Sequence, residues 1–190
     1  MMRDFLREWA DFPVIAAVGG EEKLALALQS PVRAVFFLGG SILTLPRMVA
    51  LARDHKKRVF LHMDLVDGLG RDDAAVEWCA QMLRPDGLIS TRPSLIRSAA
   101  QMGICTIQRL FLMDSASFEH GKRLLKGSPV DMVEVLPGIA PKAIAELKRA
   151  IDKPVIAGGL VTQWDEVERA LEAGAVAVSA GTPALWRSRE

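Results

Sequence analysis

Short runs of hydrophobic residues recur along the chain, separated by segments that mix charged and apolar residues. The runs are rich in β-branched residues and hydrophobic at consecutive positions, as expected for strands covered on both faces. Successive runs begin 18 to 28 residues apart, which leaves room for a strand, a helix and two short loops. The predicted strands span residues 14–18, 34–38, 59–65, 87–91, 105–112, 132–136, 154–158 and 175–179.

The segments between these runs have the features of amphipathic helices. Glycines at positions 103, 127 and 174 are expected to end three of them, and Thr162 with Asp165 predicts an N-terminal cap for another. Residues 1–12 are predicted to form a short helical lead-in. The other predicted helices span 21–29, 46–55, a segment opening at Asp72, 93–102, 117–126, 141–151, 162–173 and a short last one at 183–187.

Eight strand–helix units in sequence predict an α/β protein built as a (β/α)8 TIM barrel. An open doubly wound sheet could share this alternation, but it usually has five or six strands. A chain of 190 residues would form a barrel of minimal size, just under the usual range that starts near ~200 residues. We therefore expect one domain, residues 1–190, with no inserted domain.

The composition narrows the functional classes. Basic side chains number 24 and acidic ones 23, so bulk charge does not hold this chain on nucleic acid or membrane. No apolar run is long enough to span a membrane, and charges interrupt the first residues, so we expect no signal peptide, no membrane partner and a cytoplasmic protein. Cys79 and Cys105 form no metal or disulfide pattern and are expected to be buried thiols. The oligomeric state stays open, a homo-oligomer included.

Polar residues at the predicted strand ends are the first candidates for a site, because ligands of such barrels bind at the carboxyl ends of the strands. His62 and Asp64 are two residues apart near the end of the third strand, so we expect both side chains on the same face. They could bind a ligand. Alternatively, Asp64 could cap the following loop while His62 is a hydrogen-bonded core histidine.

A second pair of charges lies on the fifth and sixth strands. Arg109 follows Gln108 in an otherwise apolar run, and Glu134 lies between two valines. Burying an unpaired arginine is costly, so an Arg109–Glu134 ion pair is expected. Either this pair is purely structural, or it joins His62 and Asp64 in a polar ring that faces a hydroxylated ligand.

Glycine-containing turns after the seventh and eighth strands predict a phosphate site. Glycine lets backbone N–H groups approach an anion closely, and the loops after these two strands form the common phosphate site of the barrel fold. The residues concerned are Gly158, Gly159, Gly181 and Thr182. Nucleotide-binding, zinc-protease and hydrolase motifs are missing from the sequence, so we expect no metal and no cofactor.

Seven stretches, in order from about residue 12 to 186, together resemble the glycerol-3-phosphate-responsive antiterminator family. The resemblance implies a barrel that senses glycerol 3-phosphate and binds the leader mRNA of a glycerol-catabolism operon, so that transcription passes a terminator. It also implies that Gly138 belongs to the ligand site. After the eighth strand this chain has Gly181-Thr182 where the family tends toward a Ser/Thr-rich turn. The stretches are PVIAAV (13–18), HMDLVDGL (62–69), GLISTRP (87–93), QRLF (108–111), MDS (113–115), EVLPG (134–138) and PVIAGGL (154–160).

The residues that would contact RNA are harder to predict, because the pI of 7.8 is below that of a typical nucleic-acid-binding domain. Two local groups of basic residues are candidates, although such groups are more often a solvated surface. The first group is expected at the end of the barrel opposite the ligand site. The groups are Arg53, Lys56, Lys57 and Arg58, and Lys122, Arg123 and Lys126.

The sequence is compatible with three functions. The favoured one is a sensor without catalytic residues. The alternative is a small triose-phosphate or phosphosugar isomerase or lyase, with His62 or Asp64 as general base. A barrel that only scaffolds a partner is the third, and it predicts no small-molecule binding.

Overall fold

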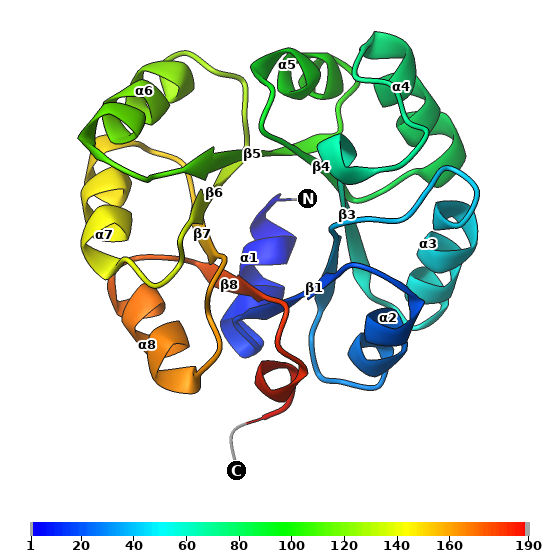
Figure 1. The fold of residues 1–190 in the computed structure, drawn as a ribbon, viewed down its shortest axis with the longest axis horizontal. Coiled ribbons are helices and arrows are strands. Elements are labelled where there is room, and N and C mark those ends of the chain that lie inside the picture. Colours follow the sequence, from blue (N-terminus) through cyan, green and yellow to red (C-terminus); the bar gives the residue numbers. More distant parts are fainter. Residues whose placement is uncertain (1, 189–190) are drawn as a thin grey trace.

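The computed structural model describes residues 2–188, whose eight parallel strands close into a barrel in sequential order, β1 to β8 (Figure 1). The predicted (β/α)8 barrel is therefore confirmed. The strands are β1 Val14–Val18, β2 Ala34–Phe37, β3 Arg58–His62, β4 Gly87–Ser90, β5 Cys105–Phe111, β6 Met132–Leu136, β7 Val155–Gly158 and β8 Ala177–Ala180.

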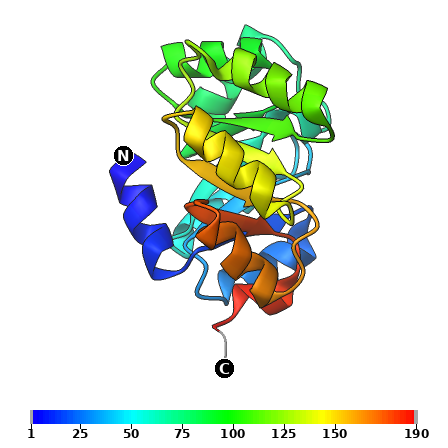
Figure 2. The ribbon, with the colours of Figure 1, turned by 90° about the vertical axis from the view of Figure 1, so that its left-hand side faces the viewer.

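Helices α2 to α8 surround the barrel, while α1 lies across one end of it (Figures 1 and 2). Other helix types occur at two places. A π-helical segment, Cys79–Leu83, continues α4, and a 3₁₀ turn, Pro183–Trp186, follows β8 in place of an α-helix. The α-helices are α1 Met2–Asp11, α2 Glu21–Leu28, α3 Leu45–Asp54, α4 Asp73–Trp78, α5 Pro93–Gln101, α6 Ser115–Leu125, α7 Pro141–Ala150 and α8 Trp164–Glu172.

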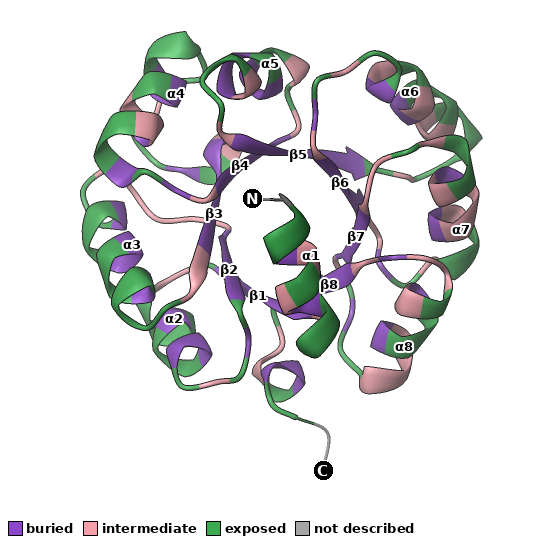
Figure 3. Cartoon of the chain, turned by 180° about the vertical axis from the view of Figure 1, so that it is seen from behind, coloured by how far each residue is buried: buried purple, intermediate pink, exposed green. Residues whose placement is uncertain are grey.

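The strands are buried on both faces, which explains their continuous hydrophobic runs (Figure 3). Outward-facing strand residues pack against the helices in a large cluster, and inward-facing ones fill the barrel in a smaller cluster that includes Ile15, Phe36 and Phe60. The lead-in helix α1 closes the amino-terminal end of the barrel, where Phe5 and Trp9 lie 5.2 and 5.9 Å from the Phe60 ring. The barrel interior is thus a packed core rather than a channel.

Several predicted boundaries were wrong for identifiable reasons. The third strand ends at His62, and Met63–Leu65 forms a 3₁₀ turn because the Asp64 side chain accepts hydrogen bonds from the segment after β4. Strand β8 begins at 177 rather than 175, since the Ala175 N–H bonds to the end of α8. The last predicted helix is the 3₁₀ turn.

The cap of α8 also differs from the expectation. The capping residue is Gln163 rather than Thr162, and the acidic partner is Glu166 rather than Asp165. The Glu166 carboxylate accepts hydrogen bonds from the N–H groups of both Thr162 and Gln163, at 2.7 and 3.1 Å. Glu166 therefore satisfies two free backbone donors at once. In a capping box the acidic residue lies three positions after the cap, which for Gln163 is Glu166 and not Asp165.

Two other expectations concern cysteines and membranes. Cys79 and Cys105 are free and buried, as predicted, and burial raises the pKa of both thiols to about 12. Within residues 2–188, no helix is both long and apolar enough to cross a bilayer.

Candidate functional site: the carboxyl end of the barrel

A polar layer lies on top of the apolar barrel interior, at the carboxyl ends of the strands. Strand side chains alternate in direction, so a residue two positions after an inward-facing one also faces inward. Each member of the layer follows an interior residue at this spacing. The layer comprises His62, Arg109, Glu134, Gly158 and Ser179, which follow Phe60, Ile107, Met132, Ile156 and Ala177.

Arg109 and Glu134 form the predicted ion pair inside this layer. They are register partners on β5 and β6, and Arg109 Nε lies 2.6 Å from Glu134 Oε2. Arg109 is 7% exposed and Glu134 is fully buried. The other carboxylate oxygen of Glu134 accepts a hydrogen bond of 2.5 Å from Ser179 Oγ. Gln108 points the other way, toward the helices, where its amide nitrogen donates to the Ser90 carbonyl.

The Arg109 guanidinium has hydrogen-bond donors that the ion pair does not use. Its terminal nitrogens, Nη1 and Nη2, have no hydrogen-bond partner among residues 2–188, since the ion pair with Glu134 uses Nε alone. A guanidinium that is nearly buried and partly unpaired favours the binding of an anionic or strongly hydrogen-bonding group. The Arg109 guanidinium is thus held by Glu134 on one side and has free donors on the other.

His62 is a buried, neutral histidine at the edge of the polar layer. Its Nδ1 atom is buried without a hydrogen bond and lies 3.8 Å from Asp64 Oδ2. Burial, reinforced by the positive charge of Arg109, lowers the pKa of His62 to about 4, against the opposing effect of Asp64. His62 and Asp64 are not related by strand alternation, contrary to the prediction, because β3 ends at His62. The 3₁₀ turn nevertheless brings the two side chains together.

Asp64 connects the loop after β3 to the loop after β4. Its carboxylate accepts hydrogen bonds from Ser90 Oγ, the Thr91 N–H and Thr91 Oγ1, all within 3.1 Å, and Arg92 Nε is 3.5 Å away. These donors occupy both oxygens, so Asp64 fixes the position of the neighbouring loop. Ser90 and Thr91 were not predicted as part of the site.

Gly138, after β6, packs against Gly158 and Gly159 at the end of β7. The Gly138 N–H donates to the carbonyls of Gly158 and Gly159, at 2.5 and 3.0 Å. A Cβ atom on Gly158 would lie 2.5 Å from Ser179 Oγ, and one on Gly138 would lie 2.8 Å from a Val161 methyl group. Gly159 has a φ of +76°, which other residues rarely adopt. Close packing and backbone conformation therefore already require glycine at these three positions.

The turn after β8 is more open. A Cβ atom on Gly181 would meet nothing closer than 3.7 Å, and Gly19 and Gly20, after β1, have open space around them. Lys23, in the first turn of α2, donates from Nζ to the Gly181 carbonyl at 2.9 Å. A lysine ammonium thus lies beside the predicted Gly181–Thr182 phosphate turn. It was missed because the two positions are 158 residues apart in sequence.

The first group of basic candidates lies at the amino-terminal end of the barrel, as predicted, but much of it is committed to the fold. Arg58 pairs with Glu8 at 2.7 Å and with Asp86 at 3.2 Å. Lys57 Nζ donates to two backbone carbonyls, and Arg53 hydrogen-bonds the Arg84 carbonyl. Lys56 is exposed. The second group, Lys122, Arg123 and Lys126, lies at the carboxyl end of α6.

Within residues 2–188, no group of three or more His, Cys, Asp or Glu side chains is arranged to hold a metal ion. The polar layer and the adjacent Asp64 together present one arginine, one neutral histidine and two carboxylates. Such an arrangement can bind a small polar anion and its hydroxyl groups.

Comparison with known proteins relates this chain to one family. Residues 14–186 match the model of the glycerol-3-phosphate responsive antiterminator family. The structure of a glycerol uptake operon antiterminator regulatory protein from Listeria monocytogenes str. 4b F2365 is similar, with a TM-score of 0.89, 34% identity and coverage of 93% of this chain and 95% of that one.

Two further proteins are similar over nearly their whole length. A glycerol uptake operon antiterminator-related protein from Thermotoga maritima MSB8 has a TM-score of 0.82 and 32% identity, covering 91% of this chain and 96% of that one. The uncharacterized protein YgcP of Escherichia coli (strain K12) is 34% identical over 174 residues, which are 92% of this chain and 91% of that protein. The chain belongs to the glycerol-3-phosphate responsive antiterminator family.

Proposed function

We propose that the protein is a transcription antiterminator that responds to glycerol 3-phosphate. It would bind this ligand at the barrel mouth and the leader mRNA of a glycerol-catabolism operon elsewhere, so that transcription passes a terminator. The observation that carries the proposal is the match to the family model over residues 14–186. Such a regulator would act in the cytoplasm, where the transcript is made.

The polar layer suits the glycerol moiety. Arg109 offers free guanidinium donors, and the neutral His62 ring can accept or donate. Glu134, whose two oxygens are bound by Arg109 and Ser179, would contribute by holding the guanidinium in place. Asp64 would contribute by holding the segment at Thr91 rather than through free oxygens. Gly138 would contribute by fixing the Gly158–Gly159 loop.

The phosphate would bind between the loops after β7, β8 and β1. Backbone N–H groups of Gly159, Gly181 and Thr182 are the proposed donors, and the Lys23 ammonium supplies positive charge beside Gly181. The open space around Gly19 and Gly181 supports this location, because an anion needs room at the backbone.

No side chain needs a catalytic role in this proposal. Ligand binding would shift the protein toward the conformation that binds RNA, which requires that the two conformations differ in ligand affinity. The mouth of an enzyme-like barrel would then serve as a sensor.

Phosphorus NMR of glycerol 3-phosphate with the purified protein, followed over hours, tests the proposal. We expect saturable line broadening without new signals. New phosphorus signals would instead support the isomerase or lyase alternative. An unchanged spectrum would reject ligand binding at the mouth and leave a scaffold function.

Lys23→Gln tests the location of the phosphate. Losing a charge-assisted hydrogen bond should weaken glycerol 3-phosphate binding roughly tenfold in titration calorimetry. The matched control is Lys142→Gln, an exposed lysine in the first turn of α7, for which we expect no change. Equal affinity of the Lys23→Gln variant and the wild type would place the phosphate elsewhere.

A further inference from the structure

The loops at the two ends of the barrel carry opposite net charge. Loops that follow strands, at the mouth, hold two basic and four acidic residues, whereas loops that precede strands hold six basic and three acidic residues. A polyanion is therefore repelled by the mouth and attracted by the amino-terminal end. The basic residues of the amino-terminal loops are Arg33, Lys56, Lys57, Arg84, Lys126 and Lys153.

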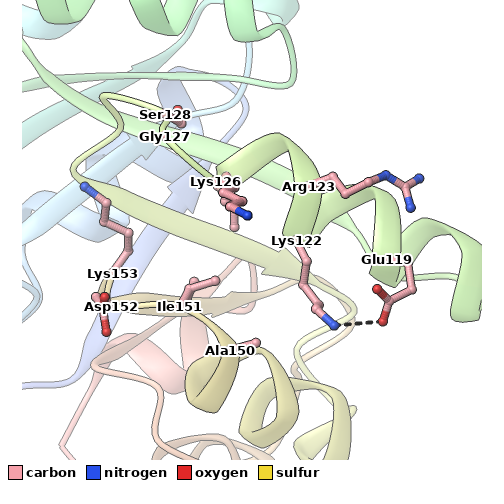
Figure 4. A pocket seen from close by; sticks show the side chains of 11 residues that line it. Glu119, Lys122, Arg123, Lys126, Gly127, Ser128, Ala150, Ile151, Asp152 and Lys153 are labelled. Carbon is pink, nitrogen blue, oxygen red and sulfur yellow. Dashed lines mark hydrogen bonds and ion pairs between the residues drawn. The ribbon is translucent and has the colours of Figure 1, made fainter.

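A cavity of about 600 Å³ opens at this end, between the carboxyl end of α6 and the loop that joins α7 to β7 (Figure 4). Four cationic side chains, from Lys122, Arg123, Lys126 and Lys153, line it together with two acidic ones. We call this cavity the α6–α7 cleft. Lys153 is separated in sequence from the other three cations, so the run of basic residues at 122–126 indicated only three of the four.

Most of this positive charge is uncompensated. Lys122 pairs with Glu119 at 2.8 Å, but Arg123, Lys126 and Lys153 have no acidic partner within 4 Å among residues 2–188. The helix dipole favours cations in the last turn of α6, which accounts for Lys122 and Arg123. Lys126 is the C-cap residue of α6, where the dipole also favours a cation, whereas Lys153 lies three residues beyond the end of α7. The cleft thus gathers more positive charge than helix electrostatics alone accounts for.

We propose that the α6–α7 cleft binds the sugar-phosphate backbone of the leader RNA. The inference rests on the proposed function and specifies where its RNA partner docks. Lysine and arginine around a hollow of this size can contact successive phosphates, and the Ser128 hydroxyl at the cleft can donate to a phosphate oxygen. The other basic group is a weaker candidate, because Arg58 and Lys57 are already bound within the fold.

The cleft is also connected to the mouth by two strands. Strand β6 starts next to the segment that contains Lys126 and ends beyond Glu134. Strand β7 starts two residues after Lys153 and ends at Gly158. The same two strands thus carry cleft residues at one end and ligand-site residues at the other.

The double variant Lys126→Gln/Lys153→Gln tests the inference. The probe is the fluorescently labelled leader transcript of a glycerol-catabolism operon, including its terminator hairpin, titrated at saturating glycerol 3-phosphate and several salt concentrations. We expect binding to weaken at least tenfold near 0.1 M salt. The slope of log affinity against log salt should fall by about 1.5, since each lost phosphate contact contributes roughly 0.7 to 0.9.

Arg47→Gln/Lys142→Gln is the matched control, because it removes two exposed positive charges from the opposite end of the barrel. We expect its affinity for the transcript to stay within twofold of the wild type. Melting temperatures of both double variants should match the wild type, which separates a loss of contacts from a loss of folding.

Three results would overturn the inference. Equal weakening by both double variants would show bulk charge rather than a site, while the proposed function would stand. Unchanged RNA binding with loss of readthrough in a transcription assay would assign the cleft to a protein of the transcription machinery. Failure of the wild type to bind the transcript at any ligand concentration would reject the proposed function itself.

Discussion

At the scale of single residues, His62 makes stability depend on pH. Its pKa is about 4 in the folded protein and near the ordinary 6.5 in the unfolded chain, because burial and Arg109 disfavour its charged form. The unfolded state therefore binds more protons between pH 6.5 and 4, and stability falls as the pH is lowered through this window. Between pH 7 and 4.5 this contribution amounts to a loss of about 2 kcal/mol.

His62→Gln should remove that contribution. Urea unfolding at pH 7 and pH 4.5 measures it, and the pH-dependent loss should be smaller in the variant than in the wild type. His120→Gln, at an exposed histidine of α6, is the matched control and should keep the wild-type loss. If both variants lost the same stability on acidification, His62 would not be the buried titrating group.

Gly158 is the second residue whose replacement has a definite expected outcome. A Cβ atom there would lie 2.5 Å from Ser179 Oγ and 2.6 Å from Glu134 Oε1, inside the buried polar layer. Gly158→Ala should therefore destabilise the protein by about 1–3 kcal/mol. Gly19→Ala, where the new methyl group would meet nothing within 4 Å, should change stability by less than about 0.5 kcal/mol in the same urea titration. If both variants changed stability equally, the side chains of the polar layer could shift to make room for the new methyl group.

Residues of the candidate site differ in how far sequence could predict them. Arg109 and Glu134 were predictable, because a charge inside an apolar strand needs a partner and neighbouring parallel strands supply one. Lys23 and Thr91 were not, because their contacts depend on how loops from different units meet in space. A loop contact has no periodicity that a sequence pattern could reveal.

At the scale of elements, α1 is the closure of the amino-terminal end. Phe5 is 1% exposed and packs edge-on against Phe60, so the helix completes the barrel core. Phe5→Ala should cost about 3–5 kcal/mol of unfolding free energy, measured as a lower urea midpoint. Leu26→Ala, at a half-exposed leucine of α2, should leave the midpoint nearly unchanged. A Phe5→Ala midpoint equal to that of the wild type would mean that α1 is only loosely attached.

Elements were predicted well in type and less well at their ends. The strands followed from continuous apolar runs, since both faces of a barrel strand are buried. The predictions for the end of β3 and the cap of α8 were wrong, because side-chain hydrogen bonds of Asp64 and Glu166 determine these positions. Such bonds compete with regular backbone pairing and leave little trace in hydrophobic patterning.

At the scale of the whole molecule, the barrel followed from counting strand–helix units, because eight units of this length have few other closed arrangements. The charge difference between its ends did not follow from composition, since the net charge of the whole chain is only +1. It arises because the loops that precede strands carry more basic residues than the loops that follow them. A near-neutral pI therefore conceals loops of net positive charge at one end of the barrel and loops of net negative charge at the other.

The packed interior has a consequence for how the two ends can communicate. Side chains fill the space between the mouth and the amino-terminal end, so β6 and β7 are the direct links between the ligand site and the α6–α7 cleft. A five-residue strand such as β6 is about 16 Å long and has little freedom to stretch. If the protein binds both proposed partners and these strands shift as units, thermodynamic reciprocity applies: the factor by which glycerol 3-phosphate raises RNA affinity is the factor by which bound RNA raises ligand affinity. A cell that contains the transcript would then respond to a lower concentration of the metabolite than a cell that does not.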